Sequence, residues 1–464
     1  MVLLLIGIGQ DARADLPEIL LKFQPYIWAE EAYTNNVDLT QKNTKSDFIT
    51  TISPGIRFST LAKSPVTGES KQPPPLAGEL GWRPATEEEK VGLEFDYRPG
   101  FVYYLKETDN NYISQNGTLN AWYTVASKLT FRLSEYLIRS EEPLEPAYPG
   151  YAPTYISGTF VDLTSLNLPG SQQRRFVYFR NVVNPSVEYA YARDSVVSVG
   201  YRNNIYRTED PAGEDSQENF INPKLTHWFD IRNGILLDYG LSFGTFQRSP
   251  DLTGNAIRGR YTYRFNPRTS LFGEYSFLLR SFDPPGVDYQ VQSPSIGLVH
   301  AFSPTLSISV QAGYYWQNPE KGSGNSAPNY VVLLTQRDAR TTYSLLAQGG
   351  YRENFFATGN TNQGFMIYHS AVGAVTHQFT EKITGTLSGS YEYDKSGVVE
   401  MSGPIIPVSR TDQIWRATGG LRYQWLRWLN LSVNLSYTGD DSNISANDYT
   451  ELRAMFRVEA TYKK

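Results

Sequence analysis

The chain has 464 residues, a formal charge of −5 at pH 7 and no cysteine. The lack of cysteine excludes zinc ribbons, iron–sulfur sites, thiol catalysis, disulfides and covalently attached c-type haem. The weakly acidic balance offers no basic surface to a nucleic acid, so no nucleic-acid partner is expected.

Aromatic residues are abundant, with 33 Tyr, 23 Phe and 8 Trp against 4 Met. This composition suits β-structure with amphipathic aromatic side chains at a boundary. No apolar run approaches the roughly 18 residues that a membrane helix needs. Transmembrane strands need no such run, because their apolar side chains occupy alternate positions.

The N-terminus has a short apolar run, residues 2–8, followed by a small-x-small sequence at residues 12–14. This arrangement is typical of a secretory signal peptide, although the basic n-region is missing, as it would be in a truncated signal. A buried strand over residues 2–8 is the alternative. We predict a signal peptide over 1–14 and a single domain over 15–464, because no linker divides the remainder.

From about Lys22 onward, the chain repeats segments in which apolar and polar side chains alternate. Residues 91–98 and 429–437 are clear examples, with Val, Leu, Phe or Tyr at every second position. Successive strand residues point to opposite faces, so each segment has one apolar and one polar face. Because no helical period appears that could cover the apolar faces, we expect lipid to cover them.

Short and long connections alternate along the chain, as in outer-membrane barrels with short periplasmic turns and longer external loops. Short turns are predicted at residues 126–128, 193–195, 231–234, 266–269, 303–305, 380–382 and 426–428. Longer loops are predicted at residues 208–216, 282–288, 318–327, 395–409 and 439–447. The alternation survives only if 329–336 is a strand that turns at 337–339 into a strand over 340–352. The prediction is an all-β, transmembrane, antiparallel up-and-down barrel of about 20 strands, with 18 as the main alternative.

Two segments are atypical for such a barrel. Residues 61–89 are rich in proline and by parity form a long periplasmic insert. Residues 141–173 are by parity a long external loop, with Tyr148, Tyr151 and Tyr155. These tyrosines would stack on sugar rings if the loop folds inward, and otherwise lie on the surface.

The polar parity of the strands should line the lumen, and about twenty strands leave an aqueous channel. The predicted pore-lining arginines are Arg98, Arg132, Arg202, Arg258, Arg260, Arg264, Arg352, Arg416, Arg422, Arg453 and Arg457. Lys224 and eight carboxylates share this parity: Glu94, Asp96, Glu188, Asp230, Asp238, Glu274, Glu392 and Glu459. The arginines would either guide an anionic solute or pair with carboxylates across strands and only stiffen the wall.

Catalytic groups are sparse. The four histidines are His227, His300, His369 and His377, and no serine elbow, metal-ligand spacing or paired-carboxylate signature accompanies them. His227 and Asp230 form the one local His/Asp pair, but three residues apart on a strand they face opposite sides. We therefore predict no enzyme activity and no catalytic, cofactor or metal site.

Several segments resemble a family of outer-membrane β-barrel porins often found beside exopolysaccharide gene clusters. They are YTNNVD at residues 33–38, KSDFIT at 45–50, ISPG at 52–55, and residues 127–140 and 180–189. The resemblance implies a large barrel in the outer membrane of a Gram-negative bacterium. Some members of this family are thought to be exit channels for secreted polysaccharide, and no binding residue carries over from them.

The expected function is passive conduction of a hydrophilic, anionic polymer, most naturally in exopolysaccharide export. The alternatives are a general diffusion porin for small solutes, a structural or docking barrel whose lumen a partner plugs at 61–89, and a soluble all-β protein. Expected partners are outer-membrane lipid, lipopolysaccharide and a periplasmic polysaccharide-export component. Acidic external loops at 209–215 and 440–441 would hold divalent cations that bridge lipopolysaccharide, or would only be solvated.

Overall fold

The computed structural model describes residues 23–60, 90–126, 128–141, 175–192, 194–211, 213–355, 364–399 and 408–462. The predicted signal peptide, the insert at 61–89 and residues 142–173 of the external loop, with its tyrosines, lie outside this range. Among the described residues, no helix combines the length and the apolar character that a membrane crossing requires.

The described chain forms twenty strands in one sheet. The strands are β1 (Phe23–Thr34), β2 (Asp47–Ser59), β3 (Val91–Tyr104), β4 (Tyr112–Val125), β5 (Leu129–Ser140), β6 (Tyr178–Ala192), β7 (Ser195–Thr208), β8 (Ser216–Trp228), β9 (Asn233–Phe246), β10 (Leu252–Asn266), β11 (Thr269–Phe282), β12 (Tyr289–Ala301), β13 (Leu306–Pro319), β14 (Ser326–Arg337), β15 (Thr341–Asn354), β16 (Gly364–Gln378), β17 (Ile383–Val399), β18 (Val408–Leu426), β19 (Leu429–Ser442) and β20 (Tyr449–Thr461). Two single-turn 3-10 helices, η2 (Thr108–Asn110) and η4 (Ser445–Asn447), lie in the described connections.

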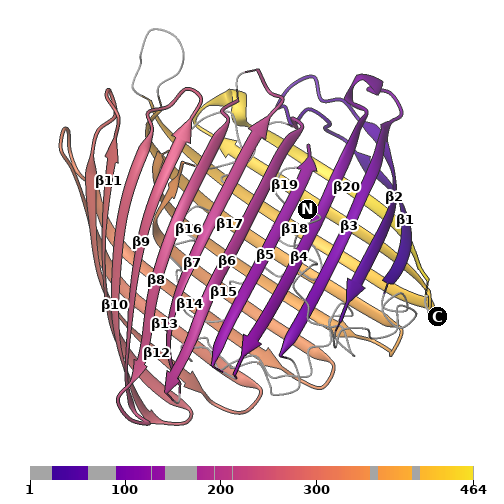
Figure 1. Cartoon of the computed structure of the whole chain (residues 1–464). Coiled ribbons are helices and arrows are strands. Elements are labelled where there is room, and N and C mark those ends of the chain that lie inside the picture. The colour runs from indigo at the N-terminus through magenta and orange to yellow at the C-terminus, as the bar shows by residue number, and fades with distance from the viewer. Residues whose placement is uncertain are drawn as a thin grey trace, which may run out of the picture.

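Each strand pairs antiparallel with its sequence neighbours, and the sheet closes on itself (Figure 1). Closure runs through β1 and β20, where Tyr26 pairs with Thr461 and Thr34 with Arg453. A closed sheet has no unpaired edge, which is the requirement for a sheet in a bilayer. The predicted all-β antiparallel barrel is confirmed, with twenty strands and not eighteen.

The predicted connections agree with the strand boundaries. Every predicted short turn falls within two residues of a short connection, and β14 and β15 confirm the extra strand pair that parity required. Three loops are shorter than predicted, one of them because β13 continues to Pro319 and β14 begins at Ser326. β17 continues to Val399 and β18 begins at Val408, and β19 continues to Ser442. Polar residues occur on both faces near these strand ends. The alternation of apolar and polar residues that identifies a strand therefore stops before the strand itself ends.

Loop lengths also orient the barrel. All the short turns lie at one end, together with the first residue of β1 and the last of β20. Apart from the connection between β2 and β3, which joins strand ends on the short-turn side, the longer connections, such as 35–46 and 209–215, lie at the other end. Because periplasmic turns are short in outer-membrane barrels, the first end is the periplasmic end and the second is external.

The outer face combines exposed apolar side chains with hydrogen-bonded tyrosines. Leu387, Leu435 and Ile257 are 64%, 52% and 50% exposed on this face. Outward tyrosine hydroxyls bind side chains of neighbouring strands. Tyr191 with His227 and Tyr261 with Asn233 lie near the periplasmic end, whereas the tyrosines of the other pairs lie near the middle of their strands: Tyr201 with Asn219, Tyr239 with Asn255, Tyr275 with Gln292 and Tyr391 with Gln413. Tyrosine suits this face, because its ring is apolar and its hydroxyl is satisfied.

Candidate functional site

The inner wall of the barrel carries most of the charged side chains. On β10, Ile257 and Tyr261 are 50% and 48% exposed on the outer face, whereas Arg258 and Arg260 are 2% and 3% exposed on the opposite face. The same alternation of faces runs through the paired strands, so register alone decides which charges point inward.

By this register, all the predicted pore-lining arginines lie on the inward face. Their strands are β3 for Arg98, β5 for Arg132, β7 for Arg202, β10 for Arg258, Arg260 and Arg264, β15 for Arg352, β18 for Arg416 and Arg422, and β20 for Arg453 and Arg457. Lys224 and the predicted inward carboxylates share this face, with one exception.

The exception is Asp230, whose predicted place on the inner wall is wrong. β8 ends at Trp228, and Asp230 lies in the exposed turn before β9, where alternation no longer applies. Its carboxylate accepts hydrogen bonds from the side-chain amide of Asn233 (2.7 Å) and from the backbone N–H groups of Arg232 and Asn233. These hydrogen bonds lower the pKa of Asp230, and the bond from the Asn233 side chain has the largest effect. His227 points outward toward Tyr191, so His227 and Asp230 form no catalytic pair.

Most inward arginines are paired with carboxylates of other strands. The ion pairs are Arg132–Glu188 (3.1 Å), Arg202–Glu218 (2.8 Å), Arg258–Asp238 (2.5 Å), Arg260–Glu274 (2.7 Å), Arg352–Glu392 (2.8 Å) and Arg457–Glu30 (2.5 Å). Within the described ranges, Arg416 and Arg422 make no ion pair. Pairing cancels most of the arginine charge, so the wall has a much weaker positive field than the residue count suggests.

Inward arginines also occur outside the predicted set. Arg57 binds Asp96 at 2.7 Å and Glu459 at 3.1 Å, which ties β2 to β3 and β20. Arg280 and Arg410 are also inward and buried. The signal that could have found them was present, because Arg280 has the parity of Glu274 on the same strand.

Inward aromatic rings lie flat on the wall over glycines of adjacent strands. A Cβ atom added at Gly92 would lie 1.9 Å from the Trp122 ring, and one added at Gly234 would lie 2.7 Å from the Trp228 ring. Guanidinium groups stack on several of these rings, as Arg264 does on Trp228 at 3.5 Å. Only glycine leaves room for this packing, so the rings face the lumen without projecting into it.

Exposure of the inward charges is uneven. Arg132 and Lys224 keep 37% and 33% of their side-chain area accessible. Arg258 and Glu353 keep 3% and 0%. The accessible charges lie toward the periplasmic half of β5 and β8, and the crowded ones lie on β9–β11 and at the external ends of β11–β18.

Acidic residues of the external loops hydrogen-bond to the loops themselves, in some cases to a neighbouring loop. Glu214 accepts hydrogen bonds from the backbone N–H groups of Arg248 and Ser249. Asp440, predicted in a loop, is instead a buried inward residue of β19. No group of three or more His, Asp or Glu side chains suited to a metal ion occurs in the described part of the chain.

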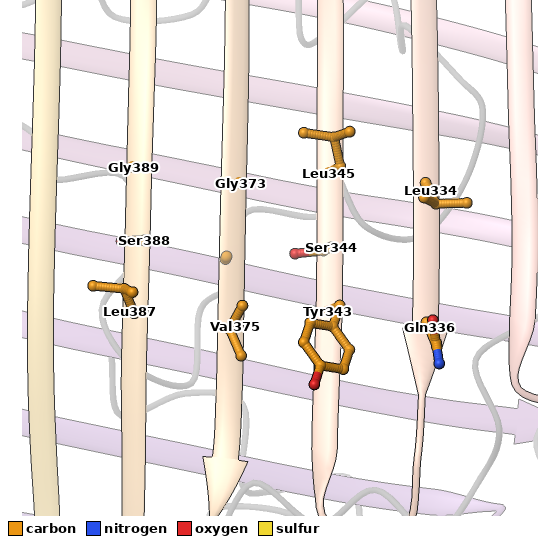
Figure 2. A pocket seen from close by; sticks show the side chains of 11 residues that line it. Leu334, Gln336, Tyr343, Ser344, Leu345, Gly373, Val375, Leu387, Ser388 and Gly389 are labelled. Atoms are coloured by element: carbon orange, nitrogen blue, oxygen red, sulfur yellow. The ribbon is translucent and has the colours of Figure 1, made fainter.

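A surface groove of about 440 Å³ lies on the outer face (Figure 2). Tyr343, Leu345 and Leu387 flank it, and Gly373 and Gly389 form its floor. It has no titratable group apart from the tyrosine, and it faces lipid, so it is not a site for the hydrophilic solute.

Comparisons with known proteins agree with this architecture. Residues 243–462 match a family model described as "Putative beta-barrel porin 2". No curated protein sequence matches the chain. The predicted localisation in the outer membrane of a Gram-negative bacterium is confirmed by the porin match and the closed barrel.

The chain is also similar, at low identity, to solved structures of outer-membrane proteins. The outer membrane protein opdK from Pseudomonas aeruginosa is 9% identical with a TM-score of 0.41, covering 95% of this chain and 99% of its own. The siderophore receptor PirA from the same organism is 8% identical with a TM-score of 0.47, covering 94% and 80%. OccAB2 from Acinetobacter baumannii is 9% identical with a TM-score of 0.39, covering 95% and 98%.

Proposed function

We propose that this outer-membrane β-barrel, of which residues 243–462 match a porin family model, is a channel that passively conducts a hydrophilic polysaccharide, in exopolysaccharide export. The match to a porin family model is consistent with a channel that catalyses no reaction. Transport would be driven by the concentration of polymer in the periplasm or by a partner there.

The observation that carries the proposal is the combination of flat aromatics and paired charges on the inner wall. Trp122 is a half-buried inward ring, and Arg132 with Glu188 presents donors and acceptors that are partly accessible to water. Sugars stack their C–H faces on aromatic rings and exchange hydroxyl hydrogen bonds with such pairs. A polymer can slide along repeated weak contacts of this kind.

The charge balance bears on the polymer's own charge. Since most inward arginines are paired with carboxylates, the positive field of the wall is weak and does not select for a highly charged anionic solute. Arg416 and Arg422, without ion pairs among the described residues, favour acidic sugars over basic ones. We therefore propose a neutral or moderately anionic polysaccharide.

The partners proposed for this channel are outer-membrane lipid, lipopolysaccharide and a periplasmic component of polysaccharide export. A partner that plugs the lumen from the insert at 61–89 would make the barrel a docking scaffold instead. Copurification from mild detergent separates the two: an isolated monomer favours the channel, and an obligate companion favours the scaffold.

Planar-bilayer recordings with added oligosaccharides test the conducted solute. Wild-type channels should show ion current and transient blockades by long oligosaccharides. Trp122→Ala should shorten those blockades, whereas Trp425→Ala, which changes an exposed ring on the outer face, should leave them unchanged. Ion current without blockades, together with unchanged surface polysaccharide in a gene deletion, would favour a general diffusion porin.

A further inference from the structure

The external end of the β15–β16 hairpin leaves the barrel wall. β14 pairs with β15 only as far as Tyr330 opposite Gly349, and β14 residues nearer its start pair with β13 alone. Beyond Gly349, β15 pairs only with β16. Gly350 has a φ of +147°, a conformation open to glycine and strained for other residues, and it marks the point of departure.

Beyond Gly350 the hairpin passes to the inside of the wall. Ile367 has the parity of His369, which stacks on the outward Tyr330. Yet Ile367 packs on a cluster of inward-facing side chains from β8–β13. On β15, the Tyr351 ring lies 5.0 Å from that of Tyr315, a fully buried inward residue of β13. The same face of β16 therefore points outward at His369 and lies against the inner wall at Ile367, two residues nearer the end of the hairpin.

A buried ion pair fixes the hairpin in this position. Glu353 of β15 binds Arg280 of β11 at 2.6 Å, and Tyr289 of β12 donates its hydroxyl to the same carboxylate. The Glu353 and Arg280 side chains are 0% and 8% exposed. β11 and β15 are not neighbours in the sheet, so this contact is possible only across the concave side of the wall.

The opposite face of the hairpin carries Arg352. Its guanidinium binds Glu392 at 2.8 Å and also Asp394, both on β17. Glu392 keeps 29% of its side chain accessible, so this group lies at the edge of the remaining lumen. The hairpin end thus spans the space between the inner faces of β11–β13 and β17.

We propose that this infolded end, residues 350–355 and 364–367, is the constriction of the channel, and that Arg352 with its two carboxylates determines its preference between cations and anions. The proposal rests on the proposed channel function and adds the element that limits passage. A segment inside the wall reduces the cross-section, and the charges at the narrowest point dominate ion selection.

The position of the hairpin is tested first by cross-linking in intact outer membranes, which the absence of native cysteine makes clean. The pair Tyr315→Cys and Tyr351→Cys should form a disulfide. The matched pair Tyr314→Cys and Tyr351→Cys should not, because Tyr314 points outward and is 38% exposed. A disulfide between positions 314 and 351, with none between 315 and 351, would overturn the proposal. This result would not depend on which solute the channel conducts.

Its role is tested by single-channel conductance in KCl. Glu353→Ala leaves Arg280 buried without its partner and should release the hairpin, raising conductance at least about 1.5-fold. The double variant Arg280→Met with Glu353→Met keeps the volume without charge and should restore the wild-type value. Equal conductance in the wild type and the single variant would overturn the constriction. No current from any of these proteins would overturn the channel function itself.

Ion preference gives an independent measurement. Arg352→Gln leaves two carboxylates at the constriction and should raise the potassium-to-chloride permeability ratio at least about twofold. Arg427→Gln removes the same charge from the turn after β18 and should leave the ratio unchanged. Equal effects of the two substitutions would refute the assignment of Arg352.

Discussion

An arginine at position 435 tests which face of each strand meets lipid. Leu435 lies on β19, is 52% exposed on the outer face and pairs with Gly419 and Ala454. A tilted strand rises about 2.5 Å per residue along the membrane normal. Leu435 comes six residues after Leu429, the first of the strand, which places it about 15 Å from the periplasmic end, near the middle of an apolar band of roughly 25 Å.

An arginine near the midplane costs a transmembrane barrel about 2–4 kcal/mol. We expect Leu435→Arg to lower the free energy of unfolding by that amount, measured by reversible denaturant unfolding in lipid vesicles. Leu435→Ala separates the loss of the leucine from the added charge. Asn434→Arg, one residue earlier on the inward face, should cost less than about 1 kcal/mol because the charge remains in the polar lumen.

The pair of arginine variants can refute the register of β19. A one-residue slip would exchange the two faces, and the larger cost would then move to Asn434→Arg. Equal costs at both positions would contradict a lipid-facing outer wall altogether.

Three further outcomes follow from the inner wall and the turns. Gly92→Val should destabilise the barrel by about 1–3 kcal/mol, because the new side chain collides with the Trp122 ring, and adding Trp122→Ala should recover part of the loss in the same unfolding assay. Arg260→Met should cost about 3–5 kcal/mol by leaving the buried Glu274 unpaired, whereas Arg260→Met with Glu274→Met should be far closer to wild type; equal losses would contradict the pairing. Because the pKa of Asp230 is lower in the folded protein than its ordinary value of 3.8, the carboxylate stabilises the turn fully at a pH above 3.8. This stabilisation is lost as the pH falls through the lowered pKa. Unfolding midpoints measured from neutral to acidic pH should therefore fall less steeply in Asp230→Asn, and parallel profiles would show that the turn contributes nothing.

Much of the fold could be predicted from alternation and turn spacing. The strand pair β14–β15 shows the strength of the argument, because parity alone required it and the structure contains it. The same argument failed at Asp230 and at Asp440. In both places a strand boundary, and not the parity within a strand, decided where the side chain lies.

The candidate site was predicted only in part. Parity indicated that Arg258 and Arg260 face inward, as in the structure, but it did not reveal that Asp238 and Glu274 neutralise them. Cross-strand partners depend on register between strands, and register is set by turn geometry and strand stagger that a single segment does not encode. The count of arginines therefore overstated the positive field.

By itself, the sequence indicated about twenty strands, the two faces of each strand and the environment of each face, because backbone pleating and turn chemistry act over a few neighbouring residues. Only the closed barrel determined which charges meet and where the lumen narrows. Glu353 reaches Arg280 across a wall that must curve before the two strands can approach, and Gly350 lets the hairpin bend into the space that closure creates. Contacts across a concave surface depend on the curvature of the whole sheet, so no local sequence pattern could predict them.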